Sequence, residues 1–313
     1  MKIVILDDTV ITQEQAERLG RYGHVEIFSG IADGYHEVLA RARGAEVIIA
    51  SWTRISAEII QALPDLRFIS VWATGYDNVD LEAATGQGIK VAHVPGYAAS
   101  AVAEFTIGLI IAVLRKIFPA DQNLRKTRQL NWSLFQGAEL RGKRLGLLGT
   151  GAIGARVAEI ASAFGSKLLA FDFYPKSSLA EKYNLEYLAL DEVLTRSDIV
   201  SLHLPLTAAT QGFISTREFD LMPPGAIFIN TARAAIVDQA ALLAALDSGR
   251  LSAAGLDDID LTLESAQKLL DLDQVILTPH IGFNTREAIL QKTDICIENI
   301  IQFLQGHPMN IVN

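Results

Sequence analysis

Short apolar segments alternate with amphipathic ones along the whole chain of 313 residues. Short runs of apolar residues predict buried parallel strands, and longer stretches with apolar positions at helical spacing predict helices. In the first part of the chain we expect strands at Lys2–Leu6, Val25–Phe28, Glu46–Ala50, Phe68–Val71 and Lys90–Ala92, and helices at Thr12–Leu19, Tyr35–Ala42 and Ala57–Ala62.

The same alternation starts again in the second part of the chain. The predicted strands there are Arg144–Leu148, Lys167–Phe171, Ile199–Leu202, Ala226–Asn230, Ser252–Leu256 and Val275–Leu277, with a helix at Ala155–Phe164. Strands that alternate with helices are typical of parallel sheets covered on both faces. The sequence therefore predicts an α/β protein with two doubly wound parallel-sheet domains.

Two further helices define the domain organisation. Ser100 is expected to cap a long helix that runs to Lys116, between the two blocks, and an amphipathic helix at 285–304 is expected to return to the first block. The chain would then pass between the domains twice. Residues 1–99 and 286–313 would form one domain, and residues 100–285 the other. A cleft between two such domains is a common place for a dinucleotide and a small substrate to meet.

A glycine-rich turn follows the first strand of the second block. The segment Gly149-Thr-Gly-Ala-Ile-Gly154 lies between that strand and the start of a helix. In such a turn Gly149 permits the tight bend, Gly151 lets the backbone approach a pyrophosphate, and Gly154 lets helix and strand pack closely. Backbone N–H groups near Ala152 and Ile153 would bind the anion. The pattern predicts a dinucleotide site.

Asp172 ends the next predicted strand, where an acidic residue accompanies this turn in dinucleotide-binding proteins. A carboxylate there accepts hydrogen bonds from the ribose 2′-OH and repels a 2′-phosphate. The expected cofactor is therefore NAD(H) rather than NADP(H).

Composition and charge exclude several classes of protein. Half of the residues are hydrophobic and 20% are charged, which is typical of a globular protein with a sizeable core. The net charge is −9, with 36 acidic and 27 basic residues and no basic cluster, so we expect no nucleic-acid partner. The most apolar helix, Phe105–Leu114, is flanked by Glu104 and Arg115 and is about half the length needed to span a bilayer, so no membrane partner is expected.

The cellular location is expected to be cytoplasmic. Cys296 is the only cysteine, so no internal disulfide can form, as is usual in a reducing compartment. Met1 leads directly into the first predicted strand, which leaves no room for a signal peptide.

Six segments in a shared order resemble the D-isomer-specific 2-hydroxyacid dehydrogenase family, over nearly the whole chain. They are Ala73-Thr-Gly-Tyr-Asp-Asn-Val-Asp80, Val94-Pro-Gly-Tyr97 with Ala103-Glu104, the glycine turn, Ser201-Leu-His-Leu-Pro-Leu-Thr207, Asn230-Thr-Ala-Arg-Ala-Ala-Ile-Val-Asp238 and Thr278-Pro-His-Ile-Gly282. The resemblance implies a Rossmann cofactor domain inserted within a flavodoxin-like substrate domain, in a homodimer. It also implies an NAD-dependent enzyme that interconverts a small 2-oxo acid and its D-2-hydroxy acid.

The chemistry of such a reaction assigns roles to two residues in these segments. A planar guanidinium at Arg233 can bind the carboxylate and carbonyl oxygens of a 2-oxo acid in one plane, which orients and polarises it. An imidazole at His280 can donate a proton to the developing alkoxide during reduction and accept one during oxidation. No metal site is predicted.

The chain departs from the family at the glutamate that usually pairs with the histidine. Counting five residues from Asp257, the expected position holds Thr262. Glu264 is the tentative replacement, and Asp258 and Asp260 are weaker candidates. Alternatively Thr262, or no residue, holds the ring. Without a neighbouring carboxylate the imidazolium is destabilised, which would weaken reduction at neutral pH.

The resemblance implies further contacts at the site. Backbone groups of Thr74 and Gly75 would bind the substrate carboxylate. Additional cofactor contacts would come from Thr74, His203, Leu204, Pro205, Thr231, Ala232, Asp257 and Gly282, with Asp257 placed for the nicotinamide carboxamide.

The identity of the substrate is left open. Ala50 stands where phosphoglycerate-type members tend to have a basic residue, which argues against a phosphorylated substrate. Trp52 and Tyr76 could form an aromatic wall or simply pack within their domain. Hydroxypyruvate, glyoxylate, pyruvate and phenylpyruvate all fit. Two other functions stay open: a dinucleotide-sensing binding protein, favoured only by Thr262, and a dehydrogenase of another small anion such as phosphite or formate.

Overall fold

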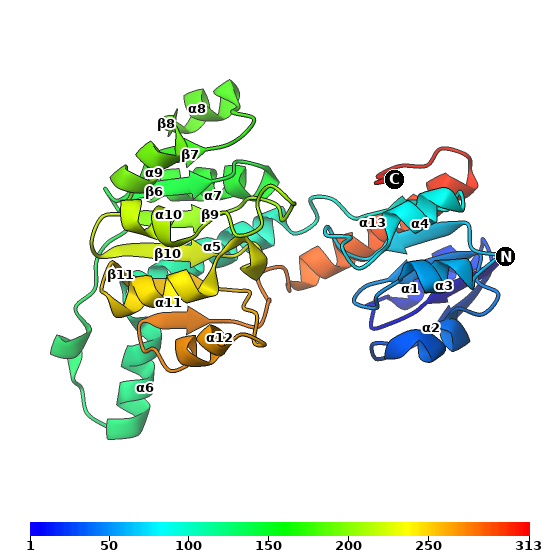
Figure 1. Cartoon of the computed structure of the whole chain (residues 1–313), viewed down its shortest axis with the longest axis horizontal. Coiled ribbons are helices and arrows are strands. Elements are labelled where there is room, and N and C mark those ends of the chain that lie inside the picture. The colour runs from blue at the N-terminus through cyan, green and yellow to red at the C-terminus, as the bar shows by residue number, and fades with distance from the viewer. The chain divides into compact units, whose positions relative to one another are not determined.

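The computed structural model describes residues 1–313, which form two compact units (Figure 1). The first unit comprises Met1–Ala98 and Asn284–Asn313, and the second Ala99–Phe283. The boundaries expected from the sequence lie within about two residues of these. In each unit every strand pair is parallel.

The first unit contains a five-stranded sheet with the order β2-β1-β3-β4-β5, the flavodoxin-like order. Its strands are β1 Lys2–Ile5, β2 His24–Ile27, β3 Val47–Ala50, β4 Phe68–Val71 and β5 Lys90–Ala92. Its helices are α1 Gln13–Gly20, α2 Gly34–Ala42, α3 Ala57–Gln61, α4 Leu81–Gly86 and α13 Arg286–Leu304. Thr285 caps α13, whose buried face includes Cys296, Ile297 and Ile300. The C-terminal helix therefore completes the first unit.

The second unit contains a seven-stranded sheet with the order β12-β11-β10-β9-β6-β7-β8. Its strands are β6 Arg144–Leu148, β7 Lys167–Phe171, β8 Leu185–Tyr187, β9 Ile199–Leu202, β10 Ala226–Asn230, β11 Leu251–Leu256 and β12 Val275–Leu277. The α-helices are α5 Ala99–Leu114, α6 Ile117–Thr127, α7 Ala152–Ala163, α8 Ser177–Tyr183, α9 Leu190–Arg196, α10 Thr216–Leu221, α11 Gln239–Asp247 and α12 Glu264–Leu269, with 3₁₀ turns η1 Trp132–Phe135 and η2 Ala234–Ile236. The order reverses between β6 and β9, as in the Rossmann fold.

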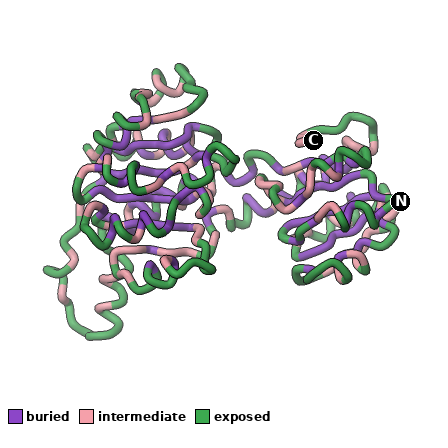
Figure 2. Tube along the Cα trace, in the orientation of Figure 1, coloured by how far each residue is buried: buried purple, intermediate pink, exposed green.

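Helices cover both faces of this sheet. One apolar core joins α5 and α7 to one face, and a second core joins α9, α10, α11 and α12 to the other. Figure 2 shows the resulting buried layer along the strands. Strands buried on both faces read as continuous apolar runs, which is why their sequences predicted them well.

Three local features differ from the sequence-based expectations. The helix expected to start after Ser100 begins at Ala99 and ends at Leu114, so Ser100 lies inside its first turn. Lys116, with φ of +51°, separates it from α6, which was not predicted because it buries no residue. The edge strand β8 was also missed, since three residues with an acidic centre give no apolar run.

The segment 117–137, called the arm below, projects from the second unit (Figure 1). It starts with α6 and includes η1, and Figure 2 colours its trace as exposed or intermediate. Leu130 is 85% exposed and Trp132 is 84% exposed. Apolar exposure on this scale is typical of an interaction surface.

No helix of the structure combines the length and the apolar character needed to cross a bilayer.

Candidate functional site

The candidate residues of the second unit lie at one edge of its sheet. The strands β6, β9, β10, β11 and β12 follow one another in the sheet and are all parallel. Gly149, His203, Arg233, Asp257 and His280 come directly after these five strands or within three residues of them. They therefore gather at the carboxyl edge, where doubly wound sheets bind their ligands.

The glycine turn has the geometry of a phosphate cradle. Gly149 has φ of +100°, and a Cβ there would lie 2.8 Å from the backbone carbon of His203. A Cβ at Gly154 would lie 2.1 Å from the carbonyl oxygen of Gly149, so only glycine fits. A Cβ at Gly151 would meet no atom within 4 Å, which leaves open space at the start of α7. These residues fit a dinucleotide pyrophosphate at the helix N-terminus.

Asp172 follows β7 and is held by the same turn. Its Oδ2 accepts hydrogen bonds from the Thr150 backbone N–H at 2.5 Å and hydroxyl at 2.8 Å, and its Oδ1 accepts from the Tyr174 N–H at 2.8 Å. Partial burial tends to raise the pKa of Asp172, but the hydrogen bonds from Tyr174 and Thr150 and the charge of Lys176 outweigh it and lower the pKa. The carboxylate is thus ionised at neutral pH.

His203, after β9, forms the opposite side of the turn. Its Nε2 lies 2.9 Å from the hydroxyl of Ser201, and desolvation lowers the pKa of His203 to about 4. The imidazole is therefore neutral at physiological pH. Leu204 is buried and Pro205 is exposed, and the carbonyl of Pro205 accepts a hydrogen bond from Thr210. This loop is a neutral, well-packed wall beside the glycine turn.

The segment after β10 is fixed by hydrogen bonds around Asn230. Its Nδ2 donates to the carbonyl of Arg233 at 3.0 Å, and its Oδ1 accepts from the N–H of Ala232 at 2.9 Å. The Thr231 hydroxyl lies 2.8 Å from that of Thr106 on α5. Arg233 Nη1 donates to the carbonyl of Ala232 at 3.0 Å. The guanidinium is therefore carried by a rigid loop.

Asp257 holds the loop that carries His280. Its carboxylate accepts hydrogen bonds from the hydroxyl of Thr278 at 2.7 Å and from the N–H groups of Ile281 at 2.9 Å and Gly282 at 2.7 Å. His280 itself has φ of +55°, a left-handed conformation that costs a residue with a Cβ about 1 kcal/mol or more. The three hydrogen bonds keep the backbone in that conformation. Asp257 thus anchors this loop, and its expected contact with the nicotinamide carboxamide stays a prediction.

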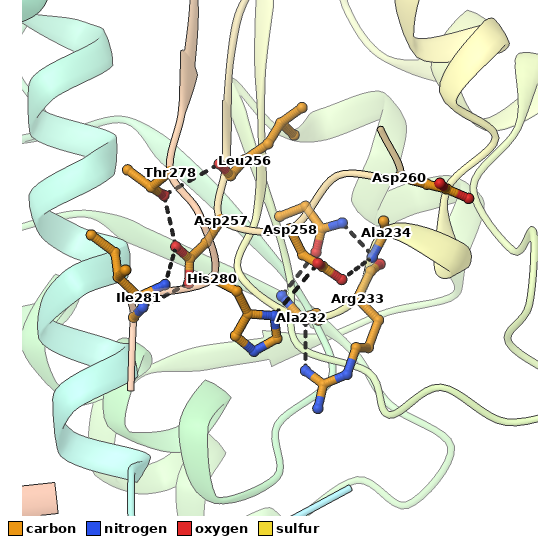
Figure 3. A network of polar contacts seen from close by, with 12 residues as sticks. Ala232, Arg233, Ala234, Leu256, Asp257, Asp258, Asp260, Thr278, His280 and Ile281 are labelled. Atoms are coloured by element: carbon orange, nitrogen blue, oxygen red, sulfur yellow. Dashed lines mark hydrogen bonds and ion pairs between the residues drawn. The ribbon is translucent and has the colours of Figure 1, made fainter. Parts of the chain in front are cut away.

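Asp258 joins the two candidate catalytic residues (Figure 3). Its Oδ1 lies 3.5 Å from His280 Nδ1, and its Oδ2 accepts a hydrogen bond from the N–H of Ala234 at 2.8 Å. Figure 3 shows the side chains of His280 and Arg233 extending from their two loops toward one another, on the same side of Asp258. The two candidate catalytic side chains thus lie on adjacent loops linked by one carboxylate.

The structure does not bring Glu264 to His280, so that expectation needs correction. Glu264 begins α12, where it forms an ion pair with Lys268 one turn later at 2.8 Å, and its side chain is 85% exposed. The Thr262 hydroxyl donates to Asp260 at 2.6 Å. Of the acidic candidates, Asp258 is the one that faces the imidazole.

The remaining candidates lie in the first unit, at the carboxyl ends of β3 and β4. The Thr74 hydroxyl donates to the carbonyl of Val94 at 2.8 Å, and Gly75 follows in the same loop. Trp52 is exposed, and Tyr76 packs partly against the core of its unit and edge-on against His93. The two readings of these aromatic residues, as a substrate wall or as packing, both stand.

Sequence reasoning missed Asp7, which organises the loop after β3. Its buried carboxylate accepts hydrogen bonds from the N–H groups of Ser51, Trp52 and Thr53 at 2.7 to 2.9 Å. Three backbone donors on one carboxylate fix the conformation in which Trp52 is displayed. The only feature of the sequence that could have indicated this role is an acidic residue directly after the first predicted strand.

Residues 107–282 match the family described as D-isomer specific 2-hydroxyacid dehydrogenase, NAD binding domain. A glyoxylate reductase of Aeropyrum pernix is 39% identical over 96% of this chain and 92% of its own length. A glycerate dehydrogenase of Methylorubrum extorquens is 36% identical over 88% of each chain.

A solved structure of an acyclic imino acid reductase, in complex with NADPH and D-Arg, superimposes with a TM-score of 0.91 at 32% identity and covers 100% of both chains. The likeness thus extends over both units and not only over the cofactor-binding part.

Proposed function

Since this chain belongs to the D-isomer specific 2-hydroxyacid dehydrogenase family, we propose that it reduces a small, unphosphorylated 2-oxo acid to the D-2-hydroxy acid with NADH. It is an oxidoreductase of 2-hydroxy and 2-oxo acids, and its cofactor is a nicotinamide dinucleotide. The observation that carries the finer proposal is the placement of Arg233 and His280 on adjacent loops at the carboxyl edge, in the unit that holds the glycine turn.

The residues of the chain divide the chemistry between them. When bound, the dinucleotide supplies or accepts the hydride. Arg233 binds the carboxylate and carbonyl oxygen of the acid and stabilises the negative charge that develops on that oxygen during reduction. His280 donates a proton to the same oxygen, and in the reverse direction it removes the proton from the hydroxyl. Backbone groups of Thr74 and Gly75, in the first unit, are the further carboxylate donors that the family resemblance implies.

The proposal is tested by NADH oxidation at several pH values with glyoxylate, hydroxypyruvate, pyruvate and phenylpyruvate. We expect turnover with glyoxylate or hydroxypyruvate, because relatives that act on these acids or their reduced forms cover most of the chain. Glycolate, the product from glyoxylate, is achiral, so stereochemistry is tested with hydroxypyruvate, pyruvate and phenylpyruvate, whose products are expected to be the D-isomers. Tight NADH binding without turnover of any acid would contradict the proposal and favour a dinucleotide-sensing protein.

Asp172 is expected to make the enzyme prefer NADH to NADPH. Its ionised carboxylate would repel a 2′-phosphate, so kcat/KM for NADH should exceed that for NADPH by at least about tenfold. In Asp172→Ser this ratio should fall by about tenfold or more, measured with the same 2-oxo acid. A wild-type enzyme that uses NADPH as well as NADH would refute the assignment.

We further propose a homodimer formed through the arm. An apolar groove of about 610 Å³ runs beside it and includes Leu114, Pro119, Phe135 and Ile276. The exposed apolar side chains of the arm would pack against a second copy, which would bury them and the groove together.

Light scattering after gel filtration at micromolar concentration tests this dimer. We expect twice the chain mass of 34.0 kDa for the wild type and the chain mass itself for the double variant Leu130→Ser/Trp132→Ser. Ile31→Ser, at another exposed apolar position, is the control and should stay dimeric. A monomeric wild type would rule out the proposal.

We infer a cytoplasmic location, which the single buried cysteine supports because it leaves the fold without a disulfide to maintain.

A further inference from the structure

The carboxylate beside the imidazole of His280 stands at a different sequence position from the one that the family resemblance implies. In the resembling family a glutamate would stand at position 262, where this chain has Thr262. The hydroxyl and N–H of Thr262 both donate to Asp260, which caps the turn before α12. Thr262 is therefore engaged within its own turn, and Glu264 pairs with Lys268 on α12.

Asp258 occupies a different place, directly after the end of β11. Its two oxygens serve two loops: Oδ1 faces His280 Nδ1 at 3.5 Å, and Oδ2 accepts the N–H of Ala234 at 2.8 Å. The side chains of Asp258 and His280 are 26% and 31% exposed, so the pair is screened only in part by water.

The charges around this pair are all on neighbouring loops of the same sheet edge. Burial tends to raise the pKa of Asp258, but the hydrogen bonds from His280 and Ala234 and the charges of His280 and Arg233 lower it overall. Asp257 uses its carboxylate on the 278–282 loop, and Asp260 uses its own on Thr262. Asp258 is therefore ionised at neutral pH and is the acid directed at the imidazole.

We propose that Asp258 is the positioning residue of the reaction, fixing the His280 ring through Nδ1 and the Arg233 segment through the Ala234 N–H with a single carboxylate. This inference rests on the proposed function, in which His280 transfers the proton. With Nδ1 directed at Asp258, Nε2 is the nitrogen that exchanges the proton with substrate. The carboxylate also stabilises the imidazolium, the form that donates during reduction.

The first test is the pH dependence of 2-oxo acid reduction in Asp258→Asn. The amide oxygen can still accept the Ala234 N–H, but the charge beside the imidazole is gone. We expect the alkaline limb of the kcat profile to shift to lower pH, and kcat at pH 8 to fall about tenfold or more. KM for the 2-oxo acid should change less than kcat, because Arg233 is retained.

Two matched variants separate this role from general effects. Glu264→Gln tests the competing assignment, and a shifted profile there with an unshifted one in Asp258→Asn would overturn the proposal. Asp191→Asn makes the same chemical change in a surface ion pair with Arg217 at 2.6 Å and should leave the profile as in the wild type. Asp258→Glu, which keeps the charge, should retain the alkaline limb better than Asp258→Asn.

A second readout does not depend on turnover. The ring proton resonances of His280, assigned by their loss in His280→Gln, are followed through a pH titration by NMR. In Asp258→Asn we expect their titration midpoint to move to lower pH, and an unmoved midpoint contradicts the pairing. If the wild type reduces no 2-oxo acid, the proposed function fails. The NMR titration still decides whether the Asp258 carboxylate acts on the His280 imidazole. If the wild type is active and Asp258→Asn keeps both the profile and the midpoint, the role of Asp258 is wrong and the function stands.

Discussion

Replacing His280 with alanine is expected to lower kcat for 2-oxo acid reduction by about 10²- to 10⁴-fold, the usual contribution of a positioned acid or base. The variant loses the proton donor that Asp258 orients, and the alkoxide must then take its proton from water. Because the hydride donor and Arg233 are untouched, KM for the acid and the affinity for NADH should change little. Steady-state kinetics and NADH fluorescence titration measure these quantities.

The control for His280 is His24→Ala. His24 lies at the surface of the first unit beside Glu26, and its loss should leave kcat unchanged. The pH dependence gives a second criterion, since the limb of the wild-type profile that reports the imidazole should vanish in His280→Ala. An active variant with the wild-type pH profile would remove His280 from the mechanism.

Replacing Arg233 with lysine is expected to lower kcat/KM for the 2-oxo acid by about 100-fold, or roughly 3 kcal/mol of transition-state stabilisation. Lysine keeps the positive charge but loses the planar fork that binds carboxylate and carbonyl oxygens together. Part of the loss should appear in KM, because the fork binds the ground-state acid as well, and part in kcat.

Arg196→Lys provides the matched control for Arg233. Arg196 forms a surface ion pair with Glu186 at 2.8 Å, and the same substitution there should have no effect on kcat/KM. A loss of less than tenfold in Arg233→Lys would show that the fork does not bind the substrate. Unchanged thermal unfolding in both variants would confirm that the fold is intact.

The strands were predicted well because their environment leaves a clear trace in the sequence. Ile199–Leu202 and Phe68–Val71 are buried at every residue, and three of the four side chains in each are apolar. β8 has only one neighbour in the sheet and an exposed glutamate at its centre, so it carries no such run. α6 buries no residue and shows no apolar stripe facing its own unit. An element that buries few or no residues leaves no such trace in the sequence.

The partner of His280 shows the limit of spacing as evidence. Asp257 and Asp258 are consecutive, yet their carboxylates have different partners. That of Asp257 accepts the backbone N–H of Gly282, whereas that of Asp258 faces the imidazole of His280 and accepts the N–H of Ala234. Successive side chains at the end of a strand point in opposite directions, but which direction meets the imidazole depends on the fold of β12 and its loop. Glu264 matches the family spacing more nearly, but its side chain pairs along its own helix with Lys268.

The assignment of candidate residues to two separately packed cores has an evolutionary consequence. The loops after β3 and β4, which carry Trp52 and Thr74, belong to the first unit, and Arg233, Asp258 and His280 belong to the second. Under the proposed function, mutations in the loops of the first unit would alter which acid is accepted, while purifying selection preserves the loops of the second. A family of duplicated genes could then change its substrate preference and keep its catalytic residues. We expect such duplicates of this chain to diverge first around the ends of β3 and β4.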